Sequence, residues 1–122
     1  LALLLNEPPA ARLAEAAARD PLRLVSAFSA LEAAVVIETK KGEGGGRELD
    51  LLLHRAQVEI AALDAGQFEI ARRAYRQFGR GRHPAGLNIG DCCAFALSKS
   101  SGEPLLFVGE DFPLTDVTAA AY

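Results

Sequence analysis

Three acidic residues of the chain stand where an α/β protein could use them for chemistry. Glu32 and Asp91 fall in the first turn of two predicted helices, and Asp111 follows the segment PLLFVG, which is typical of a buried strand. In a parallel sheet, ligands bind at the carboxyl ends of the strands, and the helices that follow strands begin at the same edge. We therefore expect the three carboxylates to lie together on one rim of the sheet.

A cluster of carboxylates repels itself, and a divalent cation is the usual way to offset that repulsion. Because carboxylate oxygens are hard ligands, they predict Mg²⁺, with Mn²⁺ as a substitute, and not zinc. Each acid also has a purely structural explanation. Ser29 and Glu32 have the spacing of a capping box. Asp91 would be stabilised by a helix dipole, and Asp111 could form a turn after its strand.

Arginine is concentrated in one short stretch, at Arg72, Arg73, Arg76, Arg80 and Arg82. Arg72, Arg76 and Arg80 recur every four residues, which places them on one side of a helix, opposite its apolar residues. This arginine stripe is either an ordinary solvated face or a track for a phosphate backbone, with Arg82 joining it from the following loop. Because the net charge of the chain is −3, any binding of a polyanion must come from a local patch of this kind.

The elements that must position these residues alternate between helix and strand. Helices are predicted in LALLLNEPPAARLAEAAARD (two, around a proline turn), SALEAAVVIETKKG, RELDLLLHRAQ, DAGQFEIARRAYRQFG and IGDCCAFALSKSSG. Strands are predicted in LRLV, VEIAAL, PLLFVG and TDVTAA, with GEGGG as a flexible connection and GRGRHPAGLN as a loop. This alternation predicts an α/β domain with a mostly parallel sheet.

The remaining features of the sequence narrow the class of protein. With 122 residues the chain is one domain, and no apolar run is long enough to span a membrane. Cys92 and Cys93 are adjacent, which fits neither a disulfide framework nor a zinc site and favours a reducing compartment. Core packing is expected for at least one of them. His54 is expected to pack partly buried in its Leu-rich helix, and His83 is expected to be exposed in its loop.

Taken together, the motifs resemble one family. HPAGLNIGDCCAFALSKSSGEPLLFVGEDFPLTDV is similar to the C-terminal half of VapC-type PIN-domain toxins, the ribonucleases of bacterial toxin–antitoxin pairs. SALEAAVVI resembles the second motif of that family, and VEIAALDAGQFEIARRAYRQFGRGRHPAGLN resembles its connecting region. The resemblance covers nearly the whole chain, so residues 1–122 are expected to form a single PIN-like domain. Its mostly parallel central sheet would be flanked by helices on both faces.

The resemblance implies a metal-dependent endoribonuclease. Glu32, Asp91 and Asp111 match three of the four acidic positions of the family, and Asp116 could assist them. The first motif of the family is an apolar strand that ends in an aspartate, and the printed sequence does not contain it. We therefore expect about ten further residues, including a first strand, before Leu1.

The family also implies partners. It suggests tRNA or ribosomal RNA as substrate, a cognate VapB-type antitoxin, and a homodimer or a heterotetramer with that antitoxin, in the bacterial cytoplasm. The apolar segments Leu1–Leu5 and Leu49–Leu53 could line a groove for the antitoxin or a dimer face, although core packing explains them equally well.

Two alternatives remain open at this point. One is a catalytically inactive PIN-fold binding module that acts with its antitoxin. The other is a receiver-like signalling domain, which is disfavoured because no lysine follows the acids after the last apolar strand.

Overall fold

The computed structural model describes residues 2–3, 21–81, 83–106 and 116. Within them, a four-stranded sheet has the order β3-β2-β1-β4, and every neighbouring pair of strands is parallel. The strands are short: β1 is Ala2–Leu3, β2 is Leu24–Ser26, β3 is Glu59–Ala61 and β4 is Leu105–Leu106. This arrangement confirms the predicted α/β class with a parallel sheet.

Ala2 and Leu3 lie in the sheet, which corrects the helix predicted for this segment. Ala2 pairs with Leu24 of β2 on one side and with Leu105 of β4 on the other, and it is fully buried. A segment made only of apolar residues shows no helical or strand periodicity of apolar and polar positions. Its conformation is therefore decided by the neighbouring strands. The strand expected before Leu1 is not tested by this arrangement. Of the residues in the predicted antitoxin groove or dimer face, Leu1, Leu4 and Leu5 lie outside the described part.

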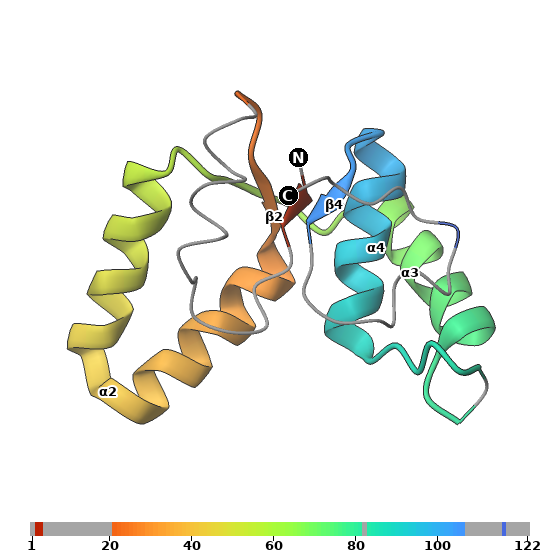
Figure 1. Ribbon diagram of the computed structural model, residues 1–122, viewed down its shortest axis with the longest axis horizontal. Coiled ribbons are helices and arrows are strands. Elements are labelled where there is room, and N and C mark those ends of the chain that lie inside the picture. Colours follow the sequence, from red (N-terminus) through yellow and green to blue (C-terminus); the bar gives the residue numbers. More distant parts are fainter. Residues whose placement is uncertain (1, 4–20, 82, 107–115, 117–122) are drawn as a thin grey trace.

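The helix α2, Ala27–Arg55, consists of two helical arms that meet at Gly42. Gly42 has φ of +67°, a left-handed conformation that glycine adopts at little cost, and the chain turns sharply there (Figure 1). The flexible connection predicted for GEGGG is wrong, because the helix resumes directly after Gly42. A side chain on Gly45 would lie 2.8 Å from Cβ of Lys41 and 3.0 Å from the carbonyl oxygen of Ile37. The glycines therefore allow the two arms to approach closely.

The helices α3, Ala65–Phe78, and α4, Ile89–Ser101, agree with their predicted limits. Asp64 caps α3 by accepting a hydrogen bond of 2.8 Å from the backbone N–H of Gln67. Gly102 ends α4 in the left-handed conformation, with φ of +74°. Both helices have strong local end signals, which explains why the sequence places them correctly.

Hydrophobic residues pack on both faces of the sheet. The neighbours Leu24 and Val25 of β2 point to opposite faces, and each belongs to a different cluster. Leu24 packs with α3 and α4, whose core residues include Phe78 and Phe95, whereas Val25 packs with Leu49 and its neighbours in α2. Figure 1 shows α2 on one side of the strands and α3 and α4 on the other. Among the described residues, none of the helices has the length and apolar composition needed to cross a membrane.

Candidate active site

Asp91 is held at the start of α4 by a capping box. Its Oδ2 accepts a hydrogen bond of 3.0 Å from the backbone N–H of Asn88, and its own N–H donates to Oδ1 of Asn88 at 2.8 Å. The residue is 7% exposed. The structural role considered for Asp91 is therefore real, and it fixes the carboxylate in position near the positive end of the helix dipole.

Glu32 lies in the second turn of α2, and not in the first turn as predicted. Ser26 is the N-cap, since its Oγ accepts a hydrogen bond of 3.3 Å from the backbone N–H of Phe28. The predicted capping box between Ser29 and Glu32 is therefore wrong. Ser29 is 1% exposed inside the helix, and its Oγ has no hydrogen-bond partner among the described residues. The helix begins earlier because β2 ends at Ser26, and this leaves Glu32 without a capping role.

The carboxylate of Glu32 lies against the first turn of α4. A Cβ built on Gly90 would overlap Oε1 of Glu32 and would lie 3.0 Å from its Cδ and 3.3 Å from its Oε2. Partial burial of the carboxyl of this exposed side chain, and then the negative charge of the neighbouring Asp91, raises the pKa of Glu32 above 4.5. The structure thus brings together two of the three predicted acids, from helices far apart in the sequence.

Cys92 and Cys93 follow Asp91 and are both buried, which confirms core packing for them. Burial, followed by the charges of Asp91 and Cys93, raises the pKa of the Cys92 thiol to about 12. Burial, followed by the charge of Glu32, raises the pKa of the Cys93 thiol. Both thiols are neutral at physiological pH, so neither is suited to nucleophilic chemistry.

The third predicted acid, Asp111, and the possible assistant, Asp116, do not add to this pair in the described part. Asp111 lies outside the described residues. Asp116 contacts Lys99, whose Nζ is 3.2 Å from Oδ2 of Asp116 and 2.9 Å from its carbonyl oxygen. Lys99 lies in the last turn of α4, about 12 Å along the axis from Asp91 at 1.5 Å per residue. Among the described residues, no group of three side chains suited to metal binding occurs.

The arginine stripe lies along α3 and the turn after it. Arg72, Arg76 and Arg80 are all exposed, as is Arg73, whereas Arg82 lies outside the described residues. Exposure agrees both with a solvated face and with a track for phosphates, so the choice between them stays open on this observation alone.

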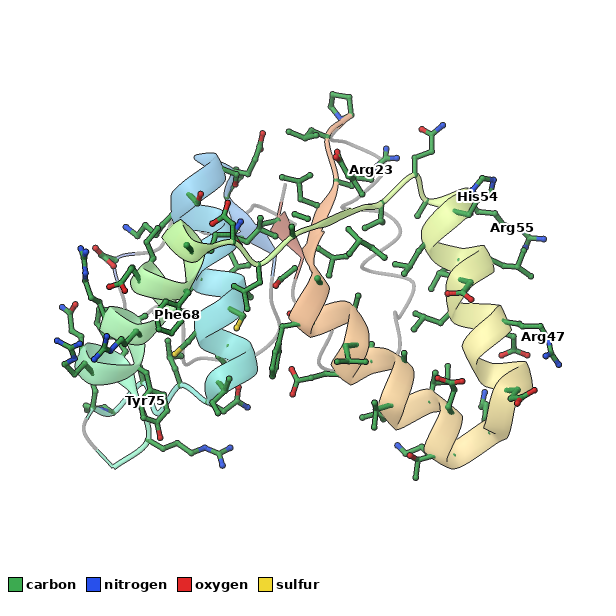
Figure 2. All side chains as sticks on the ribbon, turned by 180° about the vertical axis from the view of Figure 1, so that it is seen from behind. Arg23, Arg47, His54, Arg55, Phe68 and Tyr75 are labelled. Atoms are coloured by element: carbon green, nitrogen blue, oxygen red, sulfur yellow. The ribbon has the colours of Figure 1, made fainter. Side chains whose placement is uncertain are left out.

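An apolar cavity of about 250 Å³ opens where α3, α4 and the start of α2 meet. Figure 2 shows two of its lining residues, Phe68 and Tyr75, on α3. The sequence does not predict this cavity, because its wall is assembled from separate elements. It is lined by Phe28, Leu63, Phe68, Ala71, Arg72, Tyr75, Ile89, Cys92 and Cys93.

Both histidine expectations are wrong. His54 is exposed on the outside of the second arm of α2, because the neighbouring Leu49 and Leu53 take the core-facing positions (Figure 2). His83 is half-buried, with its ring edge-on to Phe78 at 5.1 Å, and its Nδ1 accepts a hydrogen bond of 3.0 Å from the N–H of Ala85. His83 therefore shapes its loop.

Known proteins are similar to this chain over almost its full length. The family model of the PIN domain matches residues 1–117. "Ribonuclease VapC" of Mycolicibacterium smegmatis is 59% identical over 119 residues, which are 98% of this chain and 92% of that protein. "Ribonuclease VapC30" of Mycobacterium tuberculosis is 54% identical over 121 residues, covering 99% and 92%. "Ribonuclease VapC28" of the same species is 41% identical over 121 residues, covering 98% and 91%.

Proposed function

Because the chain belongs to the PIN-domain family of VapC-type ribonucleases, we propose that it is an endoribonuclease toxin whose site contains Glu32, Asp91 and Asp111. The single observation that carries this site is the contact between two helices, which sets the Glu32 carboxylate beside Gly90 and Asp91. Membership of the PIN-domain family excludes the alternative of a receiver-like signalling domain.

The chemistry of the donor set fits a divalent cation. Two carboxylates from different helices lie close enough for the charge of Asp91 to raise the pKa of Glu32, which is the repulsion that a cation would offset. Glu32, Asp91 and Asp111 would hold Mg²⁺ or Mn²⁺, since hard oxygen ligands suit these ions. Asp116 is the weaker candidate, because its carboxylate is paired with Lys99.

The protein residues and the ion would divide the work of RNA cleavage. Bound Mg²⁺ would supply a water of lowered pKa and a positive charge that stabilises the attacked phosphodiester. Asp91 contributes a rigid carboxylate, because its capping box restricts its rotamer. Glu32 contributes a carboxylate on an exposed side chain, which is free to adjust as substrate enters.

The RNA would be positioned by the arginine stripe. Arg72, Arg76, Arg80 and Arg82 would contact phosphates, which orient the RNA but carry no sequence information. The target, of which tRNA and ribosomal RNA are the family candidates, would then be selected by RNA shape and by loop contacts.

The proposal includes a VapB-type antitoxin whose C-terminal arm folds on binding. Leu31 and Val35 are 62% and 56% exposed, one helical turn apart on the first arm of α2, and they flank Glu32. The antitoxin arm would cover such apolar residues and insert an arginine or lysine among the acids. Two copies of the chain would pair across a two-fold axis, as a homodimer or as a heterotetramer with antitoxin.

Substitution of the acids tests the proposed activity. Glu32→Gln, Asp91→Asn and Asp111→Asn should each lower cleavage of total RNA and Mn²⁺ affinity by at least roughly 10–100-fold, the range found even for residues that only support a metal ligand. Glu48→Gln, an exposed acid on the second arm of α2, is the control and should change neither. Normal cleavage by all three variants would contradict the assignment of the site. Absence of cleavage by the wild type would favour the alternative of a catalytically inactive binding module.

A further inference from the structure

Gly90 occupies a position where its backbone gives no reason for a glycine. It lies in the first turn of α4. Unlike Gly42 and Gly102, it does not have a positive φ. Alanine has a higher helix propensity than glycine, so glycine is the less favourable choice in such a conformation. The reason for a glycine must therefore be the space beside it.

That space is occupied by the carboxylate of Glu32. The three heavy atoms closest to a Cβ built on Gly90 are Oε1, Cδ and Oε2 of Glu32, the last two at 3.0 and 3.3 Å, and Oε1 would overlap the added atom. No backbone atom is among them. A side chain at this position would therefore move the end of one flexible, exposed side chain, and the fold itself could absorb the change.

We propose that Gly90 is a positioning residue, whose missing side chain leaves open the space in which the Glu32 carboxylate lies beside Asp91. This inference rests on the proposed function, because the position of the Glu32 carboxylate matters only if it binds a cation together with Asp91. It assigns to Gly90 a role that acts wholly through Glu32. An added methyl group would push the Glu32 carboxylate away from Asp91, and the site would lose one of its ligands.

Two other described glycines, Gly66 and Gly79, provide comparisons for this one. Gly66 holds the same position in α3, as the second residue of the helix, and its added Cβ would meet only Oδ1 of Asp64, at an ordinary contact of 3.4 Å. A Cβ on Gly79 would overlap the backbone carbonyl of Tyr75, so that glycine serves the fold. Gly66→Ala is therefore a control matched in helix position and in propensity.

The experiment compares Gly90→Ala with Gly66→Ala, without RNA. Both variants should melt at or above the wild-type temperature, because alanine favours the helix. Gly90→Ala should lower Mn²⁺ affinity, measured by calorimetry, by roughly 10–100-fold, the range for residues that orient a metal ligand. Gly66→Ala should leave the affinity unchanged. Mn²⁺ affinity of Gly90→Ala equal to that of Gly66→Ala would overturn the proposal.

A double-mutant cycle shows whether the effect passes through Glu32. Glu32→Asp shortens the side chain by one methylene and removes the overlap, so Gly90→Ala should cost little Mn²⁺ affinity when added to it. An equal loss in both backgrounds would overturn the proposal. If Gly90→Ala does not fold, the double variant should fold and bind Mn²⁺ like Glu32→Asp, and its failure to fold would also overturn it.

The proposed function is checked separately. Wild-type Mn²⁺ affinity in Glu32→Gln would show that Glu32 is not a ligand, whatever Gly90→Ala does. Loss of affinity in Glu32→Gln together with full affinity in Gly90→Ala would remove the positioning role alone and leave the proposed site intact.

Discussion

At the scale of single residues, Asp91 combines two roles that the sequence treats as alternatives. It completes the capping box with Asn88, and its carboxylate lies beside Glu32. Its Oδ2 accepts the hydrogen bond from the Asn88 N–H, and the cap needs an acceptor there, not a charge. The two roles can therefore be separated by substitution.

Asp91→Asn and Asp91→Ala should separate them. Asparagine keeps an acceptor for the Asn88 N–H, so metal-free Asp91→Asn should be as stable as the wild type or more stable, because it also removes repulsion with Glu32. Alanine removes the acceptor and should cost about 1 kcal/mol. Urea denaturation in the presence of a chelator measures both, and equal stability of the two variants would contradict a capping role.

Glu32 gives the metal-free protein a defined pH dependence. Burial, and then the charge of Asp91, raises its pKa above 4.5, so the folded protein holds this proton more tightly than the unfolded chain. This contribution to stability is present below the unfolded pKa and is lost as pH rises through the raised pKa. Glu32→Gln cannot titrate. The wild-type melting temperature should therefore fall relative to that of Glu32→Gln across this window, and parallel curves would contradict the assignment.

At the scale of elements, α3 has two faces with different uses. Ala74 and Phe78 are buried against the rest of the domain, and Arg72, Arg76 and Arg80 stay exposed. An arginine on a solvated face contributes little to stability, and one that contacts a phosphate adds to the salt dependence of RNA binding. Salt dependence therefore distinguishes the two interpretations of the stripe.

Changing Arg72, Arg76 and Arg80 together to glutamine should weaken RNA binding and flatten its salt dependence. Each lost phosphate contact should remove up to about 0.7 from the slope of log affinity against log salt for single-stranded RNA. Removing the same charge at Lys40, Arg47 and Arg55, which are exposed on α2, should change the slope far less. Figure 2 shows Arg47 and Arg55 on the second arm of α2. Equal changes in both triple variants would show that only net charge matters.

At the scale of the whole molecule, the acid pair and the exposed apolar residues of α2 share one region. Leu31 directly precedes Glu32, and Val35 follows one turn later. A partner that covers these leucine and valine side chains is brought within reach of the carboxylates. Inhibition and metal binding would then compete for the same charges.

Competition between the antitoxin arm and the metal is the corresponding prediction. The arm should lower Mn²⁺ affinity of the toxin, and Asp91→Asn should weaken binding of the arm, because a basic side chain of the arm pairs with the acids. Titration of Mn²⁺ with and without the arm measures the coupling. If arm and metal bind independently, inhibition acts by blocking access of RNA.

The sequence by itself determined the features that depend on near neighbours. The α/β class follows from the alternation of elements, and the limits of α3 and α4 follow from Asp64, Asn88 and Gly102. These signals act within a turn of the backbone they cap, so they hold in almost any tertiary context. The first-turn place of Asp91 was readable for the same reason.

Only the tertiary structure decided the features that depend on distant residues. Ala2 became a strand residue because β2 and β4 flank it, and α2 started at Ala27 because β2 ends at Ser26. The approach of Glu32 to Gly90, residues separated by about half of the chain, is fixed by how α2 and α4 pack around β2. Such contacts leave no periodic trace in the chain, because helix and strand periods report which side of an element is buried and not what it packs against.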